Sequence, residues 1–298
     1  MISLEGKVAV VTGSGRGLGR AYARALAAAG AAVVVNDVDS ELASETARDI
    51  VNAGGRATLA VVAVGSTEAA DQLVDHAVQD FGRLDVMCTN AGILRDRTLK
   101  NMTDEDFDLV VETHLRGTFT CGRSAVARFR VQGDGGRLIL IGSPSGQQGS
   151  FGQTNYAASK AGIVAMAWTW AMELARDEIT VNAVIPLALT RMAATIPSLI
   201  DAAEAAERGE PIPVEMRKNG IGTADDVAPL IVFLASDASS GITGQVVGIG
   251  GDELSLWSRP TEIVSEMRNG GWDADSTASA FDSLFKAHLE GVKDRSAS

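Results

Sequence analysis

The chain has little cysteine and no long apolar run. Cys88 and Cys121 are the only cysteines in 298 residues, and neither stands in a CxxC pair or at a spacing typical of metal ligands. We therefore expect two buried thiols in a reducing compartment and no metal site. No apolar stretch approaches the roughly 18 residues that a membrane-spanning helix needs, and no signal-peptide pattern precedes the first apolar run. These absences predict a cytoplasmic protein without a membrane partner.

Positive charge is also scarce. The chain carries 26 Lys and Arg against 38 Asp and Glu, which gives a formal net charge of −12. A nucleic-acid partner requires a basic surface, so we expect none. With 46% hydrophobic residues, a chain of this length can bury a full core.

Short apolar runs rich in β-branched residues alternate with longer helical patterns. The runs lie at 8–11, 32–35, 58–62, 84–87, 137–141, 180–184 and 245–249, and the helical patterns at 17–29, 40–53, 67–81, 104–131, 154–176 and 224–235. The runs do not alternate with polar residues, as is typical of strands that are covered on both faces. The sequence predicts an α/β fold: a Rossmann-type doubly wound parallel sheet of about seven strands with helices on both faces.

This sheet domain is predicted to span residues 1–251. Residues 252–298 are predicted to form a C-terminal helical extension that packs on it. Three prolines interrupt the strand and helix rhythm in 193–220, which indicates a mobile flap over a site.

A glycine-rich run, TGSGRGLG, lies between the first predicted strand and the first predicted helix. Backbone without side chains lets a pyrophosphate approach the positive end of the helix. We assign this run to dinucleotide binding, through Gly13, Arg16, Gly17, Leu18 and Gly19. An ordinary glycine-rich turn is the alternative.

Asp37 stands at the end of the second predicted strand. A carboxylate there can accept a hydrogen bond from the ribose 2′-hydroxyl and repel a 2′-phosphate, which favours NAD over NADP. Arg16 acts in the opposite direction, because a cation beside the ribose attracts a 2′-phosphate. An acidic residue near a helix N-terminus is the alternative interpretation of Asp37. We predict NAD as the cofactor, with NADP less favoured.

The tripeptide Asn90-Ala91-Gly92 follows the fourth predicted strand. Ligands of open α/β sheets bind at this carboxyl edge. We expect Asn90 to bridge strands and Gly92 to admit the cofactor. A polar turn that closes a strand is the alternative.

Tyr156 and Lys160 lie four residues apart on a predicted helix, so they share one helical face. An ammonium beside the phenol lowers the phenol's pKa from its usual value of about 10. The pair is therefore predicted to exchange a proton near neutral pH. Ser143 precedes Tyr156 by thirteen residues.

Together, the glycine-rich run, the TNAG motif at 89–92, Ser143, the Tyr156-x-x-x-Lys160 spacing and a late TGQ motif at 243–245 resemble the short-chain dehydrogenase/reductase superfamily. The resemblance covers about residues 5–251. Within that superfamily, the segments 92–97, 113–119 and 149–156 are similar to the (3R)-hydroxyacyl-CoA dehydrogenase unit of peroxisomal multifunctional enzyme type 2 and its bacterial relatives.

The resemblance implies a role for each member of the catalytic set. Tyr156 becomes the general acid/base, Ser143 polarises the substrate oxygen, and Lys160 lowers the tyrosine pKa and holds the nicotinamide ribose. His114 stands where the superfamily usually carries an Asn that helps to hold the lysine through water, and the multifunctional-enzyme group carries the same His. We include His114 among the catalytic residues; a buried, hydrogen-bonded histidine without a proton-transfer role is the alternative.

The resemblance also implies the remaining cofactor contacts. The segment after the third predicted strand lacks the Asp that commonly contacts adenine, so Gly65 and Ser66 take that contact. Pro186, Leu189 and Thr190 are expected to contact the nicotinamide and the phosphates, although the usual Pro-Gly start is missing here.

The sequence as a whole predicts an NAD(H)-dependent oxidoreductase that acts on a secondary alcohol or ketone, with a 3-hydroxyacyl-CoA or a hydroxysteroid as the first substrates to consider. Five basic residues could meet CoA phosphates: Arg95, Arg97, Arg191, Arg217 and Lys218. The alternatives are an NADPH-dependent 3-oxoacyl-carrier-protein reductase and a catalytically silent dinucleotide-sensing protein. The two long predicted helices resemble those that form subunit contacts in the superfamily, which implies a homodimer or homotetramer.

Overall fold

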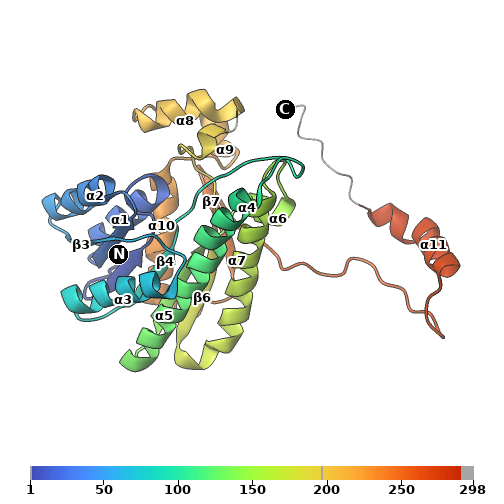
Figure 1. The fold of residues 1–298 in the computed structure, drawn as a ribbon, viewed down its shortest axis with the longest axis horizontal. Helices are drawn as coiled ribbons and strands as arrows, with labels where there is room; N and C mark the ends of the chain where they lie inside the picture. Colours follow the sequence, from blue (N-terminus) through green and yellow to red (C-terminus); the bar gives the residue numbers. More distant parts are fainter. Residues whose placement is uncertain (1, 196, 290–298) are drawn as a thin grey trace. The chain divides into compact units, whose positions relative to one another are not determined.

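The structure is a computed structural model that describes residues 2–195 and 197–289. The chain divides between Trp257 and Ser258 into two compact units. The strands of the first unit are β1 (Val8–Val11), β2 (Ala32–Asp37), β3 (Arg56–Val61), β4 (Val86–Thr89), β5 (Gly136–Ile141), β6 (Ile179–Pro186), β7 (Val246–Gly250) and β8 (Glu253–Leu256). Its α-helices are α1 (Gly17–Ala28), α2 (Ser40–Asn52), α3 (Thr67–Phe81), α4 (Asp104–Val111), α5 (Gly117–Gln132), α6 (Pro144–Gln148), α7 (Thr154–Glu173), α8 (Ile200–Glu207), α9 (Val214–Lys218) and α10 (Ala224–Ala235) (Figure 1).

The strands form one sheet in the order β3-β2-β1-β4-β5-β6-β7-β8. The first seven strands pair in parallel, and β8 pairs antiparallel with β7. The predicted α/β doubly wound sheet is therefore confirmed, with eight strands in place of about seven. Strand β8 was not predicted, because it is a short edge strand in which the exposed Leu254 and Leu256 flank a polar residue. Its pairing with β7, and not its own composition, defines it.

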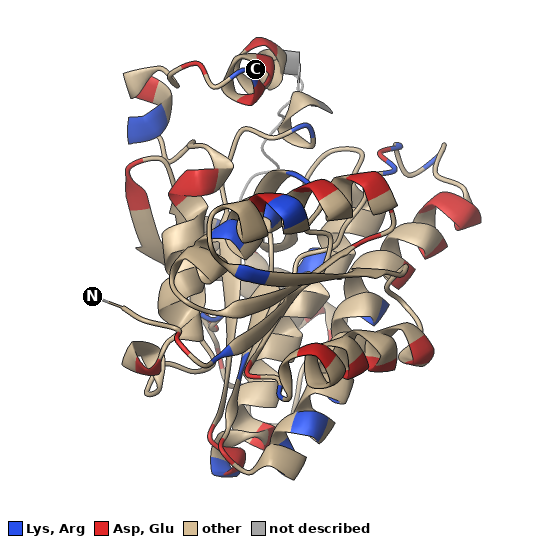
Figure 2. Ribbon diagram, turned by 90° about the vertical axis from the view of Figure 1, so that its left-hand side faces the viewer, with Lys and Arg blue, Asp and Glu red and all other residues tan. Residues whose placement is uncertain are grey.

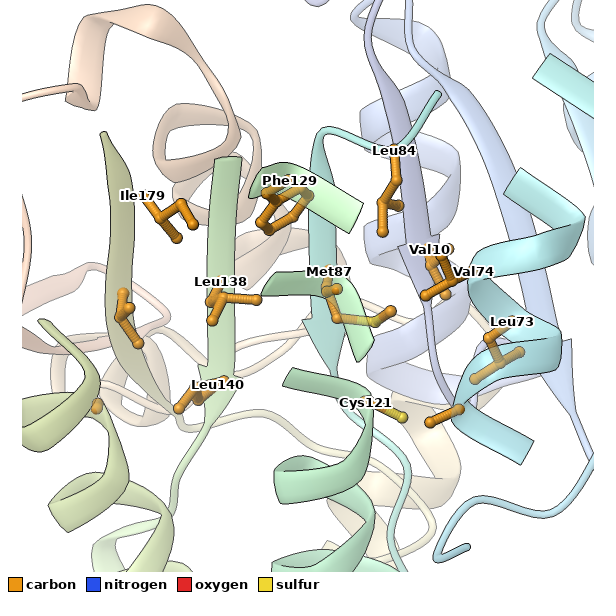
Figure 3. Close-up of a cluster of buried hydrophobic side chains, with 14 of the residues drawn as sticks. Val10, Leu73, Val74, Leu84, Met87, Cys121, Phe129, Leu138, Leu140 and Ile179 are labelled. Carbon is orange, nitrogen blue, oxygen red and sulfur yellow. The ribbon is translucent and has the colours of Figure 1, made fainter. Parts of the chain in front are cut away.

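The central strands β1, β4, β5 and β6 are buried on both faces, as their unbroken pattern predicted, whereas the edge strand β3 exposes Leu59 and Val61. Val8 and Val10 of β1 join the core that α3, α5 and α7 cover, whereas Ala9 and Val11 join the core under α1, α2 and α10. Figure 3 shows the first of these cores, to which the sheet contributes Met87 and Leu138 and α5 contributes Cys121. Cys121 and Cys88 are both buried and unpaired, as expected.

The predicted helix 104–131 is interrupted. Thr103 caps α4, and a π-helical segment, Glu112–Arg116, separates α4 from α5. A π-helical insertion widens one turn and often marks a functional position. Helical periodicity does not reveal such a break, because the sequence on either side still favours a helix.

The predicted flap 193–220 contains α8 and α9. Leu189, Ala203 and Ile212 form a small core of their own there. Arg217 of α9 forms ion pairs with Asp226 and Asp252 at 2.9 and 3.0 Å, which hold α9 to the start of α10 and to the turn after β7. The mobility of this segment stays a prediction.

The second unit contains α11 (Ala274–Ser283), which Asp273 and Ser276 cap reciprocally. The first unit extends past the predicted boundary at residue 251 because β8 belongs to the sheet. Packing of the extension on the first unit stays a prediction.

Charged side chains are spread over the helices. In Figure 2, Lys and Arg lie interspersed among Asp and Glu and do not gather into one basic face in that view. Among residues 2–195 and 197–289, no helix combines the length and apolar character that crossing a bilayer requires.

Candidate active site

The candidate site lies where the strand order reverses, between β1 and β4. At such a switch point the loops after the two strands diverge and leave a crevice at the carboxyl ends. Here these loops are tied together. Thr12 Oγ1 accepts hydrogen bonds from the backbone N–H groups of Asn90 and Ala91, at 2.9 and 3.0 Å. The Asn90 amide donates to the carbonyls of Thr12 and Gly13, at 2.9 and 3.0 Å.

The glycines of the run at 12–19 differ in what surrounds them. A Cβ on Gly19 would collide with the Gly13 carbonyl oxygen, and a Cβ on Gly13 would lie 2.8 Å from the Ala91 Cα. Both residues therefore allow close packing inside the protein. Gly17 has a φ of +55°, and a Cβ there would meet nothing within 4 Å. Of the three, only Gly17 leaves open space for a ligand.

Asp37 lies at the end of β2, against the glycine-rich run. One carboxylate oxygen accepts a hydrogen bond from Gly15 N–H at 3.0 Å, and the other accepts from Asp39 N–H at 3.2 Å. The preceding Asn36 is buried and donates to the carbonyls of Ala60 and Val62, which connects β2 to the end of β3. Backbone donors thus fix the carboxylate of Asp37 beside the start of α1.

These residues fit a dinucleotide. Arg16 is the exposed N-cap of α1 and its side chain makes no capping hydrogen bond, so the first-turn N–H groups of α1 keep the donor capacity that binds a pyrophosphate. Leu18 packs against the core under this helix. The open space at Gly17 and the carboxylate of Asp37 flank this helix start.

The other predicted cofactor residues lie at the same edge of the sheet or close to it. Gly65, with a φ of +132°, follows β3, and Ser66 Oγ caps α3 by accepting from Ala69 N–H at 3.1 Å. Pro186 ends β6, and Leu189 is buried in the small core next to α8. Thr190 is partly exposed.

Ser143, Tyr156 and Lys160 come together in the structure. Ser143 is the N-cap of α6 and its Oγ accepts from Ser145 N–H at 3.2 Å. Tyr156 and Lys160 lie in the first two turns of α7, and the Lys160 Nζ is 5.6 Å from the centroid of the Tyr156 ring. All three side chains are at least 90% buried. The ammonium donates to the Ile141 carbonyl at 2.6 Å, which holds it at the end of β5.

Comparison with known proteins identifies the family. The sequence family described as enoyl-(acyl carrier protein) reductase matches residues 13–251. The chain belongs to the short-chain dehydrogenase/reductase superfamily. It is therefore a dehydrogenase or reductase that acts on CH–OH groups with NAD or NADP.

Relatives that are named for different activities share nearly the same percentage of identical residues with this short-chain dehydrogenase/reductase. The 3-oxoacyl-[acyl-carrier-protein] reductase FabG of Thermotoga maritima is 38% identical over 83% of this chain and 98% of its own length. The hydroxyacyl-CoA dehydrogenase ChsB1 of Mycobacterium tuberculosis is also 38% identical, over 94% of this chain and 93% of its own. The mouse peroxisomal multifunctional enzyme type 2 is 35% identical over 90% of this chain, which matches 35% of that longer protein. A short-chain dehydrogenase from Mycobacterium avium superposes with a TM-score of 0.84 at 34% identity, over 97% of this chain and 98% of that one. The likeness to the multifunctional-enzyme group is therefore not exclusive.

The electrostatics of the Tyr156 hydroxyl differ from the prediction. Burial raises the pKa of Tyr156, a hydrogen bond from Ser143 lowers it, and the charge of Asp96 raises it again. Burial also lowers the pKa of Lys160 to about 7. The expected lowering of the phenol's pKa by Lys160 is wrong for this structure. The ammonium lies over the ring and donates to a backbone carbonyl, and helical spacing alone reveals neither its burial nor this contact.

His114 lies in the π-helical segment and packs edge-on against Tyr156, with ring centroids 5.1 Å apart. Its Nε2 is 3.0 Å from the backbone N and 2.8 Å from the backbone O of Ile93, so one atom meets a donor and an acceptor. Its Nδ1 is buried and has no hydrogen-bond partner among the described residues. Gly92 makes room for this ring, because a Cβ there would collide with it.

We expect His114 to make the stability of the protein depend on pH. Burial, and next the charge of Lys160, lower the pKa of His114 to about 3 from its usual 6.5. Between these values the unfolded chain binds a proton that the folded protein does not, so the free energy of unfolding falls as the pH falls. The slope is at most about 1.4 kcal/mol per pH unit. When the pH is lowered from 6.5 to 4.5, the free energy of unfolding of His114→Asn should fall by about 2 kcal/mol less than that of the wild type. Urea unfolding at the two pH values measures this difference.

The matched control is His76→Asn. His76 is partly exposed on α3, 3.8 Å from Asp80. In His76→Asn the free energy of unfolding should fall with pH as it does in the wild type. Equal acid losses in the wild type and His114→Asn would contradict the assignment of a buried, neutral His114.

Sequence reasoning missed Asn155, which is fully buried. Its amide donates to the carbonyls of Arg95 and Asp106, at 3.2 and 2.9 Å, and its oxygen accepts from Tyr156 N–H at 2.8 Å. It thereby ties the start of α7 to α4 and to the loop after β4. Its place directly before Tyr156 was the available signal.

The basic residues proposed for CoA phosphates differ in how far other residues of the protein already bind them. Arg217 is engaged by Asp226 and Asp252, so it is a structural cation. Arg95 and Arg97 are exposed, and each guanidinium donates to the carbonyl of the preceding residue at 2.8 Å. These contacts leave donors of both side chains for a ligand.

Proposed function

We propose that the protein is an NAD(H)-dependent oxidoreductase that interconverts a secondary alcohol and its ketone, with a 3-hydroxyacyl-CoA or a hydroxysteroid as substrate. The observation that carries the proposal is the buried Tyr156 between Ser143 and Lys160, at the carboxyl end of β5. Ser143 Oγ accepts from Ser145 N–H, and its hydroxyl hydrogen-bonds with Tyr156, so both hydroxyls can turn to a substrate oxygen placed between them. Tyr156 gives or takes a proton at that oxygen. Bound NAD(H) supplies or accepts the hydride.

Three residues organise the proton transfer. Lys160 and His114 contact the ring of Tyr156 from two directions, and Asn155 fixes its backbone. A buried proton donor next to a developing alkoxide stabilises it more strongly than water does, because the surroundings do not need to reorganise. A catalytically silent sensor would have no use for this set, so we set that alternative aside.

The preference for NAD rests on Asp37. Its carboxylate beside the start of α1 would repel a 2′-phosphate, whereas Arg16 would attract one. Arg16 is exposed and solvated, while Asp37 is partly buried and fixed by two backbone donors. We therefore give more weight to Asp37.

We expect Asp37→Asn to raise the ratio of kcat/KM for NADPH to that for NADH by about tenfold, because the repulsion of the 2′-phosphate is lost. The control is Asp39→Asn, which removes the same charge two residues away and preserves the N-cap of α2. It should change the ratio less than about twofold. A wild-type preference for NADPH, or an unchanged ratio in Asp37→Asn, would contradict the cofactor proposal.

The substrate proposal has one competitor, an NADPH-dependent 3-oxoacyl-carrier-protein reductase. The identity to the Thermotoga reductase favours it, whereas Asp37 and the formal charge of −12 disfavour NADPH and an acidic carrier. Initial rates with a 3-oxoacyl-CoA, a 17-ketosteroid and a 3-oxoacyl carrier protein, each with NADH and NADPH, separate the candidates. Preferred turnover of the carrier-protein substrate with NADPH would overturn our proposal. The cytoplasmic location and a homodimer or homotetramer stay predictions.

A further inference from the structure

A chain of hydrogen bonds runs beside the catalytic residues and ends on a carboxylate. The Gln153 amide nitrogen donates to Asp96 Oδ2 at 2.9 Å, and the Ser145 hydroxyl donates to Gln153 Oε1 at 3.2 Å. The amide orientation follows from the network, because only the nitrogen of Gln153 can face a carboxylate. Ser145 also donates its N–H to Ser143 Oγ. The chain therefore connects Asp96 to the serine that polarises the substrate.

The backbone around Asp96 is fixed against the segment that leads into α7. Arg97 N–H donates to the Gly152 carbonyl at 2.8 Å. On the other side, the Asn155 amide donates to the Arg95 carbonyl. These two bonds set the position of Asp96 relative to Tyr156.

No described Lys or Arg forms an ion pair with Asp96, whose Oδ2 accepts from the neutral Gln153 amide. Its Oδ1 is buried without a hydrogen bond among the described residues, and no ion pair to it occurs among them. Of the two flanking cations, Arg97 lies 4.0 Å from Asp106 instead, and Arg95 donates to the Leu94 carbonyl. A carboxylate oxygen left without a donor in a buried position is costly.

Among the described residues, Lys160 and His114 pack against the Tyr156 ring, and the carboxylate of Asp96 acts on the Tyr156 hydroxyl through its charge. Lys160 lies over the ring and has a pKa of about 7, and His114 is neutral above its pKa of about 3. The carboxylate of Asp96 is close enough to raise the pKa of the phenol. Negative charge at Asp96 is therefore felt at the reacting centre.

We propose that Asp96 determines substrate specificity by excluding molecules that carry a negative charge beside the reacting carbon. The site then takes thioesters, esters and neutral ketones, and it rejects free 3-hydroxy and 3-oxo acids. Phosphates of CoA do not conflict with this rule, since they lie many bonds from the reacting carbon. The inference rests on the proposed function, whose substrate class it narrows.

The test compares two substrates of one acyl chain: 3-hydroxyoctanoate and its N-acetylcysteamine thioester, each oxidised with NAD. We expect the wild type to favour the thioester at least about a hundredfold in kcat/KM. Asp96→Asn should reduce this ratio by about tenfold, mainly through faster use of the free acid, because a like-charge repulsion in a partly buried site is removed. The control Asp75→Asn removes one exposed charge on α3 and should keep the wild-type ratio.

Two further measurements separate electrostatics from structure. Gln153→Leu breaks the hydrogen-bond chain but keeps the carboxylate, so it should lower kcat/KM for both substrates and preserve their ratio. In Asp96→Asn the limb of the kcat/KM profile that rises with pH should move to lower pH, because the charge that raises the Tyr156 pKa is absent. If Asp96→Asn does not fold, Asp96→Ser provides the same two readouts.

The outcomes are distinguishable. An unchanged substrate ratio in Asp96→Asn, or equal use of acid and thioester by the wild type, would overturn this inference and leave the proposed function intact. Failure of the wild type to oxidise the thioester, together with inactivity toward 3-hydroxyacyl-CoA and hydroxysteroids, would overturn both.

Discussion

Tyr156→Phe should lower kcat by at least about 100-fold while NADH binding stays within about twofold of the wild type. The variant lacks only the hydroxyl that exchanges a proton with the substrate oxygen, and general acid/base catalysis contributes about 10²–10⁴ to a rate. The fold should tolerate the change. The Tyr156 hydroxyl contacts the Met192 sulfur at 3.9 Å and the Ser143 side chain, and neither contact holds an element in place.

The chain provides its own control for this experiment, because Tyr22 is the only other tyrosine. Tyr22 lies on the buried face of α1, and its hydroxyl has no hydrogen-bond partner among the described residues. Tyr22→Phe should therefore leave kcat unchanged and should not destabilise the protein. Steady-state rates with an accepted ketone and fluorescence titration with NADH check both variants. Turnover of Tyr156→Phe at the wild-type rate would refute the acid/base role.

Gly19→Ala should abolish NADH binding and lower the free energy of unfolding by about 1–3 kcal/mol. The new methyl group would collide with the Gly13 carbonyl oxygen and lie 2.6 Å from the Asn90 amide nitrogen. Because the first of these atoms is backbone, no side-chain rotation can relieve the collision. The hydrogen bond from the Asn90 amide to the Gly13 carbonyl, which connects the glycine-rich run to the end of β4, would have to break.

Gly17→Ala should separate binding from stability. The methyl group would point into open space, so the expected cost is the left-handed backbone alone, about 1–2 kcal/mol. It would stand where we place the pyrophosphate, so NADH affinity should fall at least about tenfold. Gly241→Ala, with an ordinary φ and nothing within 4 Å, is the neutral control. Urea unfolding measures the stability of each variant, and NADH titration measures its affinity. Normal NADH affinity in Gly17→Ala would contradict the proposed pyrophosphate site at the glycine-rich run.

Much of the fold followed from pattern. Each of the seven parallel strands overlaps an apolar run that predicted it, because a strand buried on both faces must be apolar. The edge strand β3 is partly exposed, and β4 begins two residues later than its run at 84–87. Strand β8 and the π-helical break before α5 did not follow. An edge strand needs only one neighbour, and a single inserted residue in a helix leaves the helical periodicity on each side unchanged.

The candidate site was only partly predictable. The spacing of Tyr156 and Lys160 placed both on one face of α7, since four residues complete about one turn. The direction of the Tyr156 pKa shift did not follow, because burial and the charge of Asp96 come from elements distant in sequence. The same holds for Arg217, which looked available for phosphates until the fold placed Asp226 and Asp252 against it.

The amino-acid sequence alone determined which chemical groups are present and which of them share a strand, a turn or a helical face, because these relations depend on local periodicity and backbone stereochemistry. The tertiary structure decided which glycines pack against protein and which faces open space, and which charges reach Tyr156. Those properties depend on distance and desolvation between segments far apart in the chain, and no local pattern records them.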